Sequence, residues 1–163
     1  VSPSSADSDT FPYYYVYGYY GFTVAEAQAT ENYNTYGVLY NWPAVMTEGI
    51  CPSGWHIPSD GEFTELTDFL GGDVAGGNIK EAGYDHWLEP NTGATNSSGF
   101  TALPGGYQFG GGGFSHIGTH GYWWSTSVAG SNSYNRKQNY NRSNVNRQDS
   151  QRRTCLSARC LRD

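Results

Sequence analysis

Basic residues are almost absent from most of this chain. Only 9 Lys and Arg occur in 163 residues, and eight of them lie between Arg136 and Arg162. The formal net charge is −6, so the molecule as a whole lacks the positive surface that general nucleic-acid binding requires. Charged residues of both signs make up only 15 %, which excludes the highly charged composition of many disordered proteins.

Long apolar runs are also missing. No stretch approaches the length needed to cross a bilayer, so we expect no membrane span, and this chain carries no recognisable signal peptide. Apolar residues account for only 37 %, but 14 Tyr, 7 Phe and 5 Trp can each bury a large area. Together with 22 Gly and 7 Pro, this composition predicts one domain with an aromatic core, many turns and few long helices.

Cysteine is scarce. The three residues, Cys51, Cys155 and Cys160, permit at most one disulfide bridge and one free thiol. A bridge requires an oxidising compartment, and the alternative is three buried, reduced thiols. The residues alone leave both possibilities open.

A single domain is expected over residues 11–163, after a flexible leader at residues 1–10. Its clearest helix covers residues 59–70, where Ser59 is a good N-cap and Glu62 completes a capping box. The predicted apolar face of this helix consists of Phe63, Leu66, Phe69 and Leu70. The glycine pair that follows ends the helix.

The other expected elements are short. A second helix is expected over residues 23–33, where Thr23 can cap it. Residues 71–121 are expected to be mostly Gly-rich loop held by single apolar anchors. A strand or hairpin is expected within residues 11–22, a strand or irregular core segment within residues 36–45, and strands at residues 122–127 and at the C-terminus.

The most unusual segment is rich in asparagine. Residues 132–146 read NSYNRKQNYNRSNVN, with six Asn in fifteen residues. Asn has poor strand propensity, so sheet stability does not explain this run. A mixture of Asn, Ser, Tyr and Arg is typical of antibody-like binding sites, whereas the alternative is a solvated polar region without a ligand. We therefore predict a variable binding segment over residues 132–153.

We expect this segment to form a β-hairpin with Arg142 and Ser143 at its centre, so that Lys137 lies opposite Gln148. Alternate side chains of a strand share a face, and the amide-bearing face is predicted to point outward while Tyr140 and Val145 point inward. The predicted ligand-binding residues are Tyr134, Asn135, Lys137, Asn139, Asn141, Asn144, Asn146, Gln148, Ser150 and Arg152.

Five stretches resemble one family in the same order. They are YGVLYNWPAV (36–45), CPSGWHIPSDGEFTELTDFLGG (51–72), TGATNSSGFTALPGGY (92–107), GYWWSTS (121–127) and SARCLRD (157–163). They resemble the Fibrobacter succinogenes major paralogous domain, which is similar to the formylglycine-generating-enzyme subgroup of the C-type lectin fold. The resemblance implies an α+β, C-type lectin-like domain with two short helices, a small antiparallel sheet and long Gly-rich loops. It also implies that Cys51 pairs with Cys160 and that Cys155 is the free thiol.

The Asn-rich segment also resembles the variable part of proteins diversified by retroelements, whose mutagenesis hits adenines in Asn codons. This resemblance implies a non-catalytic protein that displays a diversified surface, with a protein as its partner. Such a protein would act outside the cell, on the cell surface or on a virion.

A Ca²⁺-dependent carbohydrate-binding lectin is the alternative function. Glu89-Pro90-Asn91 matches the EPN triplet of sugar-binding C-type lectins, and oxygen ligands on a cis-proline turn suit Ca²⁺. However, Trp124 is followed by Ser-Thr rather than by the Asn-Asp of such lectins. We therefore expect no resident metal or cofactor, with Glu89 and Asn91 as the candidate ligands if Ca²⁺ binds.

Other chemistry is less well supported by the sequence. His116 and His120 are four residues apart, but the glycines beside them disfavour the helix that a two-His zinc site needs. A free Cys155 in a basic strand would be reactive in an oxidoreductase-like relative, but no second thiol or other catalytic group accompanies it. We expect no enzymatic activity. Binding of nucleic acid by the basic C-terminal segment is disfavoured by the acidic remainder of the chain.

Overall fold

The computed structural model describes residues 2 and 7–163; the remainder of the predicted leader lies outside the described residues. Asp7 pairs with Arg153, and Asp9 accepts a hydrogen bond from the Arg153 backbone, so the start of the chain contacts a segment near its end. The elements in chain order are β1 (Tyr14–Tyr15), α1 (Val24–Gln28), α2 (Glu31–Tyr36), β2 (Leu39–Tyr40), α3 (Trp42–Val45), β3 (Trp55–His56), α4 (Asp60–Phe69), η1 (Gly72–Val74), α5 (Ala75–Ile79), β4 (Gly105–Gln108), β5 (Phe114–Ile117), β6 (His120–Ala129), β7 (Asn132–Asn139), β8 (Asn146–Gln151) and β9 (Leu161–Arg162).

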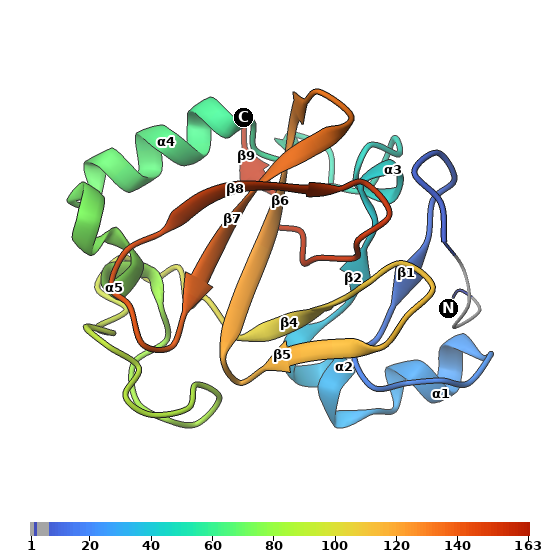
Figure 1. The fold of residues 1–163 in the computed structure, drawn as a ribbon, viewed down its shortest axis with the longest axis horizontal. Coiled ribbons are helices and arrows are strands. Elements are labelled where there is room, and N and C mark those ends of the chain that lie inside the picture. Colours follow the sequence, from blue (N-terminus) through green and yellow to red (C-terminus); the bar gives the residue numbers. More distant parts are fainter. Residues whose placement is uncertain (1, 3–6) are drawn as a thin grey trace.

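The predicted α+β class is confirmed. The largest sheet is antiparallel and has the order β6-β7-β8, while the pairs β1-β2, β3-β9 and β4-β5 form three two-stranded sheets. Figure 1 shows α4 and α5 at one end of the molecule and α1 and α2 at the other, with β6, β7 and β8 between them. The C-terminal strand lies beside β3 as an antiparallel partner, as expected from its alternating sequence.

The described residues contain five short α-helices rather than the two that were expected. The helix predicted over residues 23–33 is divided into α1 and α2, because Thr30 accepts a hydrogen bond from the backbone of Tyr33 and starts a new helix. Asn41 caps α3 in the same way. No helix within the described ranges is long and apolar enough to cross a membrane.

The predicted capping box of α4 is confirmed. Ser59 Oγ accepts from the Glu62 backbone at 3.2 Å, and the Glu62 carboxylate accepts from the Ser59 backbone at 2.7 Å. Phe63 is buried against the sheet, but the prediction that Phe69 joins the apolar face is wrong, since it is 87 % exposed. Phe69 is the last helical residue, where the chain turns away toward Gly71.

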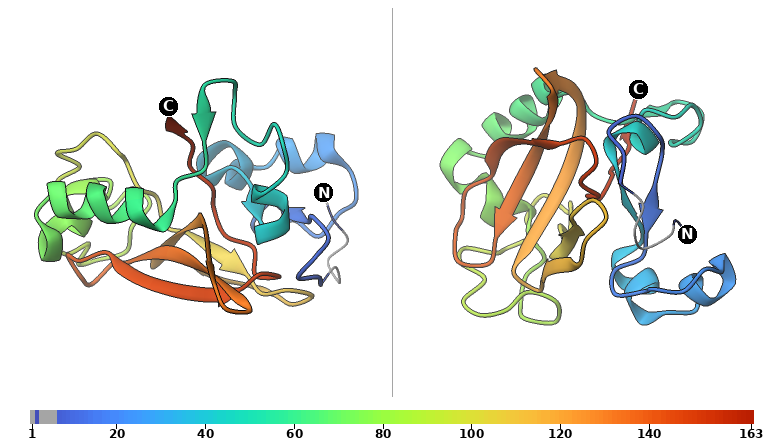
Figure 2. Two further views of the ribbon diagram at one scale, coloured as in Figure 1. Left: turned by 90° about the horizontal axis from the view of Figure 1, so that it is seen from above. Right: turned by 45° about the vertical axis from the view of Figure 1, so that its right-hand side comes forward.

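Adjacent tryptophans on β6 serve two separate core clusters. Trp124 packs with Val45 and Leu156, whereas Trp123 packs with Phe63 and Ile79 under α4. Consecutive strand residues point to opposite faces of a sheet. Trp123 and Trp124 therefore each pack against the core on a different face. Figure 2 shows β1 and β2 beside the sheet on the side away from α4.

Cys51 and Cys160 form a disulfide, as the family resemblance implied, and Cys155 is the free thiol. The bridge lies next to the pairing of β3 with β9, so it ties the C-terminal strand to the first half of the chain. Burial raises the pKa of the Cys155 thiol, and its side chain packs with Tyr15 and Leu39. Both features oppose the thiolate that a reactive cysteine needs.

Candidate ligand-binding site

The Asn-rich segment forms a hairpin, but its register differs from the prediction by two residues. Lys137 lies opposite Asn146, and Asn135 lies opposite Gln148. The cause is the connection, because residues 140–145 form a loop instead of a tight turn at its centre. A shift of two residues preserves the faces, so the side chains that were predicted to share a face do so.

The prediction that this shared face points outward is wrong for Asn135. Its side chain is 0 % exposed, and its Nδ2 donates to Ser150 Oγ at 3.0 Å. Asn135 lies opposite Trp124 of β6, so its face of the sheet packs against the first core cluster. The hydrogen bond to Ser150 compensates for burial of the Asn135 Nδ2 group. In this position the Asn135 side chain does not reach a ligand in solvent.

The remaining predicted residues differ in exposure. Asn141 is exposed, as expected. Asn144 donates to Asn146 at 2.8 Å, and both residues are half-buried. The other exposed residues of the hairpin were not on the predicted face; they are Arg142, Arg147, Asp149 and Gln151.

Two of the predicted residues are used by the fold itself. Arg152 donates to Ser133 at 3.2 Å, and its guanidinium lies 4.6 Å from the Trp42 ring centroid. Tyr134 is half-buried beneath Arg147, whose guanidinium lies 3.8 Å from the Tyr134 ring centroid. These contacts fix both side chains in position.

A buried lysine holds the hairpin loop. Lys80 is 0 % exposed, and its Nζ donates to the carbonyls of Thr92, Asn139 and Arg142 at 3.0, 3.2 and 2.9 Å. Burial lowers the pKa of Lys80 to about 8, which still leaves it cationic at neutral pH. The sequence analysis missed this role, although Lys80 is the only basic residue outside the C-terminal segment.

Backbone contacts also hold the loop of residues 140–145 in place. The Gly77 backbone donates to Ser143 at 3.0 Å, and the Thr92 backbone donates to Tyr140 at 2.7 Å. A Cβ on Gly76 would lie 2.5 Å from the Asn144 carbonyl oxygen, so only glycine allows this approach. Val145 packs on the cluster that contains Trp123, which confirms its predicted inward position.

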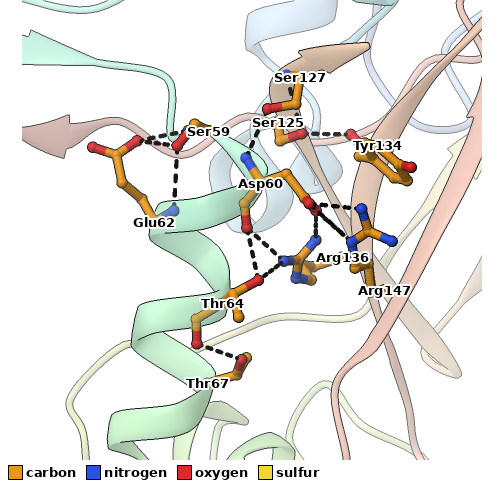
Figure 3. A network of polar contacts seen from close by, with 10 residues as sticks. All are labelled: Ser59, Asp60, Glu62, Thr64, Thr67, Ser125, Ser127, Tyr134, Arg136 and Arg147. Carbon is orange, nitrogen blue, oxygen red and sulfur yellow. Dashed lines mark hydrogen bonds and ion pairs between the residues drawn. The ribbon is translucent and has the colours of Figure 1, made fainter. Parts of the chain in front are cut away.

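An ionic network joins α4 to β7 and β8 (Figure 3). Arg136 is 3 % exposed and donates to the Asp60 carboxylate, while its other nitrogen donates to Thr64 at 2.9 Å. Arg147 donates to the same carboxylate at 2.8 Å. Burial opposes ionisation of Asp60, but the two guanidinium groups outweigh it and lower the pKa of Asp60. The network locks the orientation of the hairpin on the helix.

A cavity of about 260 Å³ opens beside β8 on the face opposite α4. Two predicted residues, Gln148 and Ser150, line it. The sequence analysis missed its aromatic walls, for which the only signal was the recurrence of Tyr and His in the β4–β6 region. The complete lining is Tyr107, Phe109, His116, Tyr122, Gln148, Ser150, Gln151, Thr154 and Leu156.

Two lining residues of this cavity, His116 and Tyr122, belong to a group of rings that also contains His120 and the cation Lys137. His116 and His120 lie 4.3 Å apart between centroids, and His116 Nδ1 is 3.2 Å from the Tyr122 hydroxyl. Lys137 Nζ lies 5.6 Å from the Tyr122 ring centroid. Burial, together with Lys137, lowers the pKa of His116, and the same causes lower that of His120 to about 4. Both rings are therefore neutral at pH 7.

The EPN triplet does not present its asparagine to solvent. The Glu89–Pro90 bond is cis, as predicted, but Asn91 is 5 % exposed and its Nδ2 donates to the carbonyls of Glu81 and Gly83. Glu89 is exposed. Among residues 2 and 7–163, no group of three or more His, Cys, Asp or Glu side chains is arranged to hold a metal ion. The expectation that no metal is resident stays a prediction, with Glu89 and Asn91 as the candidate ligands under the lectin alternative.

Removal of the Asp60 carboxylate is expected to destabilise the domain strongly. Asp60→Ala leaves buried Arg136 without its counter-charge, so the free energy of unfolding should fall by about 3–5 kcal/mol. Asp68→Ala is the matched control on the same helix, exposed and expected to change stability by about 0.5 kcal/mol or less. Urea denaturation of both variants measures the difference; equal, small losses would contradict the structural role of the network.

Calcium is expected to leave thermal stability unchanged, because Asn91 is only 5 % exposed and its Nδ2 bonds hold the side chain inside the fold, away from ions in solvent. A specific site filled at a hundred times its Kd would stabilise the protein by about 2.7 kcal/mol. Calorimetry with excess Ca²⁺ and with chelator makes the comparison. A higher Tm with Ca²⁺ that Glu89→Gln abolishes would instead support the lectin alternative.

Comparison with known proteins gives one match. The family model described as the Fibrobacter succinogenes major domain matches residues 6–162 of this chain. No curated protein and no solved structure matches it.

Proposed function

The chain belongs to the Fibrobacter succinogenes major domain family, and from this premise we propose that it is a non-catalytic ligand-binding domain that presents the β7–β8 hairpin to a protein partner. The proposal includes a C-type lectin-like scaffold and a diversified surface. The observation that carries it is the outer position of β8, which ends the three-stranded sheet and exposes Arg147, Asp149 and Gln151.

A rigid support under exposed polar side chains favours binding. The hairpin is fixed at its tip by Lys80 and along its length by Asp60, so ordering it on a partner costs little conformational entropy. Exposed Asn141, Arg142 and Arg147 offer adaptable donors and acceptors above this support. The exposed surface is broad, which suits a protein partner better than a small molecule.

The hairpin divides into positions that maintain the fold and positions that are open to variation. Asn135, Arg136 and Gln138 are buried and belong to the first group. Arg147 pairs with Asp60 and belongs with them. We assign diversification to the open positions, which are Asn141, Arg142, Asn144, Asp149 and Gln151. The disulfide supports a location in an oxidising environment, outside the cell, on its surface or on a virion.

Two matched libraries test the display surface. Randomising Asn141, Arg142, Asp149 and Gln151 should leave most variants with a cooperative melting transition and should yield binders to a chosen target such as lysozyme. Randomising buried Ser133, Asn135, Arg136 and Gln138 should abolish folding in most variants. Thermal melting and phage selection measure both outcomes. The proposal would be rejected if the exposed library unfolded as often as the buried one, or if it gave no binders.

The gene provides a separate test of diversification. We expect AAY codons at Asn141 and Asn144 and a nearby near-repeat of the segment that differs from it only at adenines. Sequencing the surrounding locus reads both directly. A locus without such a repeat removes the diversified surface from the proposal and leaves an ordinary binding domain.

A further inference from the structure

The cavity beside β8 has the dimensions and walls of a site for a single ring. Its volume of about 260 Å³ lies just below the range of drug-sized ligand pockets, so one ring fills it. Tyr107 and Tyr122 meet edge to face with centroids 5.5 Å apart, and Phe109 adds a third ring to the lining. Aromatic faces of this kind pack against the C–H surface of a ring ligand.

The polar groups of the cavity retain unused hydrogen-bonding capacity. Ser150 Oγ already accepts from Asn135, so its O–H is available to donate. Gln151 Oε1 accepts from Arg153, which leaves its Nε2 available. The Gln148 amide has no side-chain hydrogen bond within the described part of the chain. A ligand with several hydroxyl groups would satisfy these groups, whereas a hydrocarbon ring would leave them unpaired.

The charge beside the cavity is positive and uncompensated. Lys137 is half-buried and has no carboxylate within ion-pair distance among the described residues. The groups that face it are His120 and Tyr122 from β6, His116 from β5 and Arg142 from the loop, all neutral or positive at pH 7. At the opposite rim, Arg153 near Phe109 is paired with Asp7. A half-buried cation without a counter-ion favours a ligand that brings a negative charge.

We propose that this cavity binds a sugar ring that carries a carboxylate, of the uronic acid type, without Ca²⁺. The aromatic walls take the ring, and Gln148 and Ser150 take its hydroxyls. Lys137 does not line the cavity but lies over Tyr122, which does, and it takes the carboxylate that projects from the bound ring. Arg147 and Asp149 project from the other face of β8, and Gln151 is shared between the cavity and the protein-binding surface proposed above.

The test compares three probes in the presence of a chelator. Galacturonate has the ring, the hydroxyls and the carboxylate, galactose lacks the carboxylate, and benzoate lacks the hydroxyls. Titration at millimolar concentrations, followed by the side-chain amide signals of Gln148 in NMR spectra, should show galacturonate binding about tenfold more tightly than either other probe. Equal affinity for galactose or benzoate, or no perturbation by galacturonate, would overturn the proposal.

Variants test whether Lys137 supplies the positive charge that binds the carboxylate. Lys137→Met should lower the affinity for galacturonate about tenfold, to the level of galactose, and should leave galactose binding unchanged. Arg162→Met removes an exposed cation from β9, away from the cavity lining, and should leave galacturonate binding unchanged. If Lys137→Met does not fold, raised ionic strength should weaken galacturonate binding to the wild type and not galactose binding. An equal loss for both sugars, in the variant or in salt, would contradict the role of Lys137.

Discussion

Lys80 holds the exposed hairpin loop against the rest of the domain. Its ammonium group donates to three backbone carbonyls, two of which belong to the end of β7 and to the loop that follows it. A buried charge is tolerated only when its donors are satisfied, and these carbonyls satisfy all three. Because Arg142 and Asn139 are held in this way, the exposed loop residues stand on a fixed backbone. The proposed display surface therefore depends on a residue that is itself fully buried.

The second constraint is the ionic contact between α4 and the sheet. Asp60 follows the capping residue of α4 and faces two arginines of the Asn-rich segment. The basic residues that make this segment so different in composition are thus partly explained by the fold. Arg136 is a buried structural residue, and Arg147 is shared between Asp60 and the solvent.

Local chemistry made several features predictable from the sequence. The cap of α4 depends on residues three positions apart, and the strand that contains Trp123 and Trp124 depends on a short aromatic run. The pairing of Cys51 with Cys160 was implied by the family resemblance. The α+β class was likewise implied by the family resemblance. Each of these rests on neighbouring residues or on motifs with a fixed order.

The features that could not be predicted depend on contacts between distant segments. Asn135 is buried because it lies opposite Trp124, which packs in the first core cluster. These contacts lie outside the hairpin, so the hairpin sequence alone does not predict them. The register depended on the loop contacts with Gly76 and Gly77, which lie more than sixty residues earlier in the chain. The cavity is lined by residues from β4, β5 and β8, and β8 lies far from the other two strands in the sequence. No local sequence pattern predicts that these three strands line one cavity.

The alternation of packed and open positions along β7 and β8 limits how this protein can evolve. A nucleotide change that replaces Asn135 or Gln138 removes a side chain from the interior, whereas one at Asn141 alters only an exposed side chain. Substitutions at nearby Asn and Gln positions therefore differ strongly in their effect on folding. Among descendants of this chain, conserved and variable positions should therefore alternate along the hairpin.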